Sequence, residues 1–159
     1  MSELEELYQE VIIDHSRSPR NFHALKEANR QAEGYNPLCG DHFKVYLRVE
    51  NDVIKEIGFE GTGCAISKAS ASMMTGSVKG KTVAEAKALF EEFRDLFAGE
   101  SIQKVDVERL GKLAAFAGVR EYPVRVKCAT LAWHTLKAGL DGARQPVSTE
   151  LPSTEWEAG

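Results

Sequence analysis

The sequence lacks the features of several large protein classes. Basic residues are not in excess, since 20 Lys+Arg stand against 24 Asp+Glu in 159 residues, a net charge of −4. Nucleic-acid binding needs a clustered basic surface, so we expect no nucleic-acid partner. No apolar run approaches the ~18 residues of a membrane span, so we expect no membrane partner. The first ten residues, MSELEELYQE, are acidic where a secretory signal is basic and then hydrophobic.

Cysteine is also scarce. Three cysteines in a chain without an export signal argue against a disulfide framework and favour thiols or metal ligands. The length fits one ordinary domain that can bury a core without disulfides. We therefore expect a cytoplasmic protein with a single domain over residues 1–140 and a flexible tail over 141–159, in which Trp156 has no assigned role.

The N-terminal half is expected to contain one helix and one hairpin. A capping box at Ser2 and Glu5 opens the helix, and Pro19 ends it. Its apolar positions follow at helical spacing: Leu4, Leu7, Val11 and Ile12. After a polar passage, residues 36–41 (NPLCGD) indicate a loop. Alternating apolar residues over 43–49 and a second run over 53–60 predict antiparallel strands joined by a turn at residues 51–52.

The C-terminal half is expected to be helical. The patterns predict a small-residue helix over 65–78, an amphipathic helix from the capping box of Thr82 and Glu85 to a stop at Gly99, a shorter helix from about Val107 to Gly118, and a last helix from Pro123 to about 138. The fold class is therefore α+β: an N-terminal helix, a small antiparallel sheet and a helical C-terminal half.

All three cysteines occupy special backbone positions. Cys39 precedes a strand in a loop containing proline and glycine, whereas Cys64 and Cys128 lie near helix N-termini. Helix N-termini stabilise thiolates, so we expect these two thiols to be the more acidic ones. Asp41 lies two residues after Cys39, which puts both side chains on one side of the strand entry. Three thiolates and one carboxylate would complete a tetrahedral zinc site, with Arg125 and Lys127 offsetting its charge.

The spacing by itself leaves other interpretations open. Three buried structural cysteines fit equally well, because free cysteine is among the most buried residue types. Asp41 could be an Asx-turn residue. A zinc hydrolase is a poor fit because it needs an open ligand position. A purely structural zinc is a further alternative. The four histidines are interpreted as surface, core or partner-contact residues rather than ligands: His15, His23, His42 and His134.

Several segments in the same order resemble one known family. Residues 36–41 (NPLCGD), 61–67 (GTGCAIS) with 69–74 (ASASMM), and 125–133 (RVKCATLAW) resemble the iron–sulfur cluster assembly proteins of the IscU/SufU group, the NifU N-terminal-like family. Residues 7–8, 14–15 and 19–21 resemble that family's first helix and its exit. The resemblance covers roughly residues 4–140.

Within the family, two departures favour the SufU branch over the IscU scaffold branch. Scaffold proteins carry a histidine before the third cysteine, where this chain has Lys127. Their Leu-Pro-Pro-Val-Lys motif corresponds here to residues 121–125 (EYPVR), which keep one proline. The long interval between Cys64 and Cys128 also resembles the SufU insertion.

The SufU resemblance implies a zinc held by Cys39, Asp41, Cys64 and Cys128, and a role as acceptor of persulfide sulfur from a SufS-like cysteine desulfurase. We expect Cys39 to leave the metal when the desulfurase docks and to attack the persulfide, because its loop moves at least cost. The chain would then be an accessory of its partner enzyme rather than a stand-alone enzyme. The alternative is an IscU-like scaffold that assembles an iron–sulfur cluster on the same cysteines. Other Suf assembly proteins are further candidate partners.

Overall fold

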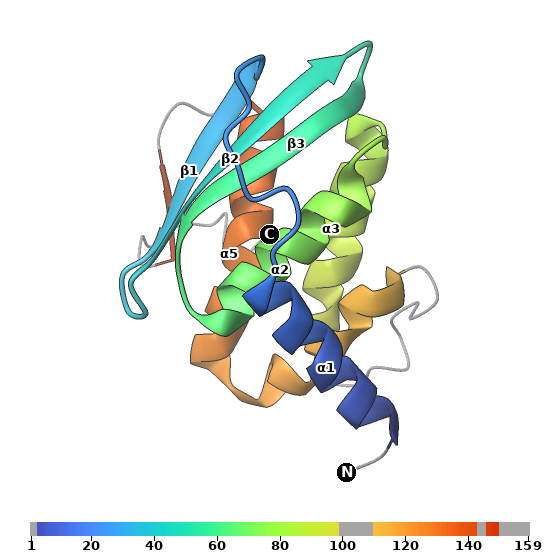
Figure 1. The fold of residues 1–159 in the computed structure, drawn as a ribbon, viewed down its shortest axis with the longest axis vertical. Helices are drawn as coiled ribbons and strands as arrows, with labels where there is room; N and C mark the ends of the chain where they lie inside the picture. The colour runs from blue at the N-terminus through green and yellow to red at the C-terminus, as the bar shows by residue number, and fades with distance from the viewer. Residues whose placement is uncertain (1–2, 99–109, 143–145, 150–159) are drawn as a thin grey trace.

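The computed structural model describes residues 3–98, 110–142 and 146–149 (Figure 1). The elements run in the order α1 (Glu3–Arg17), β1 (Arg30–Asn36), β2 (Asp41–Glu50), β3 (Val53–Thr62), α2 (Ala65–Val78), α3 (Val83–Ala98), η2 (Gly111–Glu121), α5 (Pro123–Leu140) and β4 (Val147–Ser148). The α+β class is confirmed. Figure 1 shows the helices gathered on one face of the sheet, where α5 contacts β1 and β2 and α2 contacts β3.

The N-terminal helix ends where the sequence predicts. It stops at Arg17, two residues before Pro19, and Tyr8, Val11 and Ile12 pack against the core. Leu7 is 54% exposed although it shares the apolar spacing, because α1 buries only the sides that contact α2 and η2. The cap at Ser2 and the side chain of Leu4 lie outside the described residues.

The predicted hairpin is present. Strands β2 and β3 pair antiparallel, and the turn residues Asn51 and Asp52 have positive φ angles of 52° and 62°. Asparagine and aspartate tolerate this left-handed backbone, which joins two-residue hairpins. The alternating residues of β2 are buried on the helix-covered face. The buried face of β2 therefore agrees with the pattern in the sequence, whereas the register shift between Arg48 and Val49 was not predicted.

Two strands of the sheet are not predicted by the sequence analysis. The segment of β1 belongs to the polar passage that follows the first helix. Its inward-facing residues are Ala32, Gly34 and Asn36, none of which has a large apolar side chain. β4 lies within the segment assigned to the flexible tail, yet it pairs parallel with β1. The sheet has the order β3-β2-β1-β4 and is mixed rather than purely antiparallel. The domain boundary at residue 140 stays a prediction, and Trp156 lies outside the described residues.

The helical half follows the prediction with one correction. Thr82 Oγ1 accepts from the Glu85 backbone N–H, and Glu85 accepts from the Thr82 N–H, both at 3.0 Å, which is a reciprocal capping box. The helix expected to stop at Gly118 is instead a 3-10 segment, η2, that continues to Glu121. The predicted start at Val107 and the stop at Gly99 lie outside the described residues.

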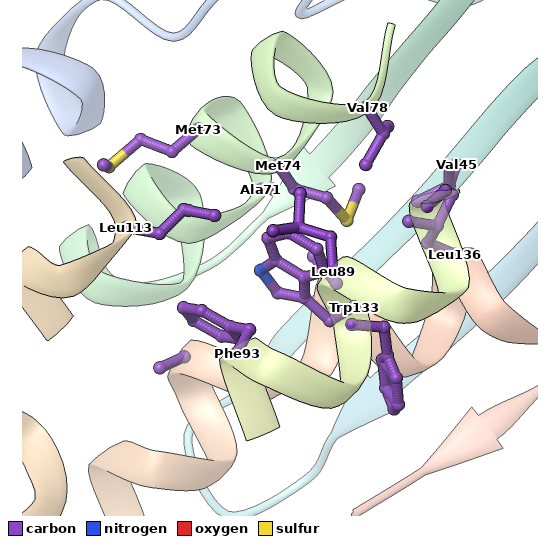
Figure 2. Packing of buried hydrophobic residues seen from close by; sticks show 14 of the residues in the cluster. Val45, Ala71, Met73, Met74, Val78, Leu89, Phe93, Leu113, Trp133 and Leu136 are labelled. Atoms are coloured by element: carbon purple, nitrogen blue, oxygen red, sulfur yellow. The ribbon is translucent and has the colours of Figure 1, made fainter. Parts of the chain in front are cut away.

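The core forms where α2, α3 and α5 meet the sheet. Figure 2 shows Phe93, Trp133 and Met74 among the buried residues of this core; the rings of Phe93 and Trp133 stack with centroids 4.7 Å apart. The Trp133 indole N–H donates to Ser70 Oγ at 3.2 Å, which satisfies its buried donor. This packing fixes α5 against α2, two of the elements that carry cysteines. In the part of the chain that the structure describes, none of the helices has the length and apolarity to cross a bilayer.

Candidate metal centre

The first candidate ligand lies in the turn between β1 and β2. Asn36 and Asp41 face each other as the last pair of that antiparallel ladder, so residues 37–40 form a short exposed connection. Cys39 is exposed in this turn, and its backbone N–H donates to the Asn36 carbonyl at 3.2 Å. Gly40 has a φ of +73°, a conformation that glycine adopts without strain. The ladder thus presents one exposed thiol beside one strand-anchored carboxylate.

The second cysteine caps a helix. Cys64 is the N-cap of α2, and its sulfur accepts from the Ser67 backbone N–H at 3.4 Å. The preceding Gly63 is required by packing, because a Cβ there would lie 2.8 Å from Phe43 Cζ and 2.9 Å from Asp41 Oδ1. The predicted position at a helix N-terminus is confirmed for Cys64. The tight approach of this loop also brings it against Asp41.

The third cysteine comes from α5 and meets the first. Cys128 is buried, and its Sγ lies 3.4 Å from Cys39 Sγ. Among the described residues, Cys39, Asp41 and Cys128 form a group whose ligand atoms all lie within 4.8 Å of one another. Two cysteines 89 positions apart in the sequence therefore lie close together, whereas Cys64 is not a member of this group.

The Asp41 carboxylate connects the group to Cys64. Asp41 is 2% exposed; its Oδ1 accepts from the Cys64 backbone N–H at 2.9 Å, and its Oδ2 accepts from Asn36 Nδ2 at 3.2 Å. A buried carboxylate needs such donors to offset lost hydration. The bond to Cys64 reaches another element, so Asp41 is more than a residue that satisfies its own turn.

The expectation that the Cys128 thiol is unusually acidic is wrong. Burial raises the pKa of the Cys128 thiol, and the adjacent Cys39 thiol, the charges of Cys64 and Asp41 and a bond to Cys64 raise it further. Cys128 is the sixth residue of α5, past the first turn, where the free N–H groups of a helix lie. In this surrounding the thiol keeps its proton unless a cation stabilises the thiolate.

The donor set fits a zinc ion. Tetrahedral zinc with Zn–S bonds of about 2.3 Å holds its sulfurs about 3.8 Å apart, close to the 3.4 Å between Cys39 and Cys128. The Asp41 carboxylate lies in the same group, as a harder oxygen donor. Thiolates also suit iron–sulfur clusters, so the donor atoms alone do not select zinc.

One residue with a direct role in the site was not singled out by the sequence analysis. Asn36 is fully buried; its Nδ2 donates to Asp41 Oδ2 and lies 3.5 Å from Cys128 Sγ. The only signal in the sequence is an asparagine three residues before Cys39, at the end of a strand that was not predicted. Its amide thus links two candidate ligands from β2 and α5.

The model of the NifU-like N terminal domain matches residues 7–140. The chain belongs to this family.

The similar proteins include both a sulfurtransferase and cluster assembly scaffold proteins. The zinc-dependent sulfurtransferase SufU of Bacillus subtilis (strain 168) is 39% identical over 137 residues, covering 86% of this chain and 91% of the relative. The iron–sulfur cluster assembly scaffold protein IscU of Thermotoga maritima is 39% identical over 140 residues, covering 88% of this chain and 96% of the relative. A crystal structure of a candidate scaffold protein for the SUF system from Fervidobacterium islandicum AW-1 has a TM-score of 0.78 at 35% identity, covering 86% and 98%. All four candidate ligands lie inside the matched NifU-like domain.

The histidines of this NifU-like domain lie apart from the candidate ligands. His42 points to the other face of the sheet, where its Nε2 lies 3.1 Å from Glu33 Oε2 and its ring stacks on Tyr35. His15, expected as a surface or partner-contact residue, is half-buried, and its Nδ1 lies 2.7 Å from Ser72 Oγ. That contact ties the end of α1 to α2, so His15 has a packing role.

Proposed function

We propose that this chain is a zinc-containing sulfur acceptor of iron–sulfur cluster assembly that takes persulfide sulfur from a cysteine desulfurase. The observation that carries the proposal is the position of the exposed Cys39 thiol. Its sulfur lies 3.4 Å from the buried Cys128 sulfur, and the ligand atoms of these two cysteines and the buried Asp41 lie within 4.8 Å of one another. Membership of the NifU-like family and the likeness to a zinc-dependent sulfurtransferase support it.

The proposed zinc ligands are Cys39, Asp41, Cys64 and Cys128. Three of them are already grouped, and Cys64 joins them through its backbone bond to Asp41 and its effect on the pKa of Cys128. Bound zinc supplies positive charge that keeps the thiols deprotonated. The positive charge also offsets the burial that otherwise favours a protonated Cys128.

Cys39 is the proposed sulfur acceptor because access decides which thiol a partner can reach. Residues 37–40 are all exposed, whereas Cys128 is 2% exposed. The Cys39 thiolate attacks the terminal sulfur of the partner's persulfide; a new S–S bond forms on Cys39, the partner's S–S bond breaks, and the partner cysteine leaves as a thiolate. The exchange needs no oxidant or reductant, and the chain acts as an accessory of the desulfurase.

The test combines metal analysis with a sulfur-transfer assay. We expect about one zinc per chain in the purified protein, a rise in desulfurase turnover when the protein is added, and a mass increase of one sulfur on Cys39 by peptide mass spectrometry. The variant Cys39→Ser should lose this labelling. The matched control is Leu38→Ala, which alters an exposed neighbour and leaves the thiol in place. A protein without zinc, or sulfur found on Cys64 alone, would contradict the proposal.

A scaffold role is the second candidate, and the 39% identity to the IscU of Thermotoga maritima favours it specifically. The same three thiols would then hold a cluster. Anaerobic reconstitution with iron and sulfide separates the two roles. A stable visible chromophore that displaces zinc supports the scaffold, whereas retained zinc without a chromophore supports sulfur transfer.

A further inference from the structure

The C-terminal segment is attached to the sheet next to the candidate site. Val147 and Ser148 pair with Gly34 and Tyr35 of β1, and the Thr149 backbone N–H donates to the Tyr35 carbonyl at 3.0 Å. Thr149 is 6% exposed. This segment lies beyond residues 7–140, so it is outside the part of the chain that matches the family.

The Thr149 side chain reaches Asn36. Its Oγ1 donates to Asn36 Oδ1 at 3.0 Å, across 113 positions of sequence. The other end of the same amide faces Asp41 Oδ2 and Cys128 Sγ, at 3.2 and 3.5 Å. Asn36 is fully buried, so water does not replace these partners.

The polarity of this chain of bonds is fixed by chemistry. An ionised carboxylate is an acceptor only, and so is the Cys128 thiolate that a bound cation would stabilise, so the end of the Asn36 amide that faces them must be its NH2 group. The amide oxygen then points the opposite way and needs a donor. A hydroxyl can donate or accept, but here the Thr149 hydroxyl must donate.

We propose that Thr149 is a positioning residue of the metal centre: its hydroxyl holds the Asn36 amide with the NH2 group directed at Asp41 and Cys128. The inference rests on the proposed zinc site and adds β4 to it as a structural part. Hydrogen bonds to ligating groups orient them and tune their basicity, and their loss typically lowers metal affinity.

The test uses two substitutions at one position and one control. Thr149→Val removes the hydroxyl and keeps the shape and the backbone bond to Tyr35, whereas Thr149→Ser keeps the hydroxyl. Thr135→Val is the control, because Thr135 is also buried but its hydroxyl donates to the Leu131 carbonyl within α5 at 2.8 Å. Zinc affinity is measured by competition with a chromophoric chelator.

A second readout needs no metal. Side-chain NH2 protons of a buried, bonded asparagine exchange slowly with solvent, so NMR exchange rates of the Asn36 amide report its bonds in the zinc-free protein. Backbone exchange at Thr149 shows in the same spectra whether β4 stays paired. If wild-type protein binds no zinc, the proposed function is wrong. The exchange rate of the Asn36 side-chain NH2 protons then still tests whether the Thr149 hydroxyl holds the Asn36 amide.

We expect Thr149→Val to lower zinc affinity about tenfold, with Thr149→Ser and Thr135→Val within about twofold of wild type. Exchange of the Asn36 amide should accelerate in Thr149→Val alone. In an Asn36→Ala background, Thr149→Val should cause no further loss. The proposal is overturned if Thr149→Val binds zinc and protects Asn36 as wild type does, if Thr135→Val loses as much affinity, or if the loss persists without Asn36.

Discussion

Adding one methyl group at Gly63 should disturb the metal centre and the core together. A Cβ at this position would overlap Ser67 Oγ and lie 2.8 Å from Phe43 Cζ and 2.9 Å from Asp41 Oδ1. Phe43 is fully buried and Asp41 accepts from the backbone N–H of Cys64, so none of these neighbours can move freely. We expect Gly63→Ala to force apart the loop before α2 and the start of β2.

The magnitude follows from known costs of overpacking. Inserting a methyl group into packed surroundings costs typically about 1–3 kcal/mol. In a domain of this size, each kcal/mol lowers the melting temperature by roughly 2–4 °C. We therefore expect a fall of several degrees, accompanied by weaker zinc binding because Asp41 is displaced from its bond to Cys64.

Gly76 provides a matched control on the same helix. It is exposed within α2, and a Cβ there would meet nothing within 4 Å. Glycine in a helix costs roughly 0.5–1 kcal/mol relative to alanine, so Gly76→Ala should stabilise the protein. Urea unfolding of the zinc-free proteins measures both changes, and chelator competition measures zinc affinity. If Gly63→Ala unfolds at the same urea concentration as wild type and keeps its zinc affinity, the close approach of this loop to Asp41 is refuted.

Three further predictions concern charge and capping. Asp41→Ala should weaken zinc binding at least about tenfold by chelator competition, since it removes a ligand and frees the backbone N–H of Cys64; unchanged affinity would exclude the carboxylate from the site. Burial lowers the pKa of His134 from 6.5 to about 3, so the unfolded chain binds the extra proton between these values and stability should fall as pH drops below 6.5. In zinc-free protein, His134→Gln should flatten this part of the stability profile, and an unchanged slope would contradict the assignment. Thr82→Ala should cost about 1 kcal/mol in urea unfolding while Thr82→Ser costs little, because the hydroxyl caps the N–H of Glu85.

The predictable part of the fold carries its information locally. Apolar residues alternate strictly over 43–49 of β2, and the hairpin turn has two residues that tolerate positive φ. Helix α3 begins at a capping box whose two hydrogen bonds are both formed. In each case, neighbours along the chain determine the conformation. The strand β1 has no such local pattern, because its inward-facing residues Ala32, Gly34 and Asn36 are held by close packing and hydrogen bonding rather than by large apolar side chains. β4 has only two residues and no pattern, and its partner lies more than 110 positions away.

In the candidate site, too, the features set by neighbours along the chain were predictable and those set by distant segments were not. Cys39 and Asp41 were predicted to converge because their spacing along one strand entry places them on one side, and Cys128 meets them as the motif resemblance implies. The ionisation of Cys128 was not predictable from its position near a helix start. Its surroundings come from other elements, and they raise its pKa instead of lowering it. Position in a helix is local information, whereas burial is a property of the whole fold.

The three cysteines differ in burial, and the proposed function assigns them different roles accordingly. Cys39 is exposed, Cys64 is half-buried and Cys128 is buried. Under the proposed function, a partner's persulfide reaches the exposed Cys39 thiol most easily. A bound cation would benefit Cys128 most, because burial makes its thiolate the costliest to form. The proposal therefore assigns acceptance of sulfur to Cys39 and retention of the metal to Cys128, whose sulfur atoms lie 3.4 Å apart. In this proposal, sulfur placed on Cys39 lies next to a buried thiol and a buried carboxylate, and the buried Asn36 amide contacts both of them.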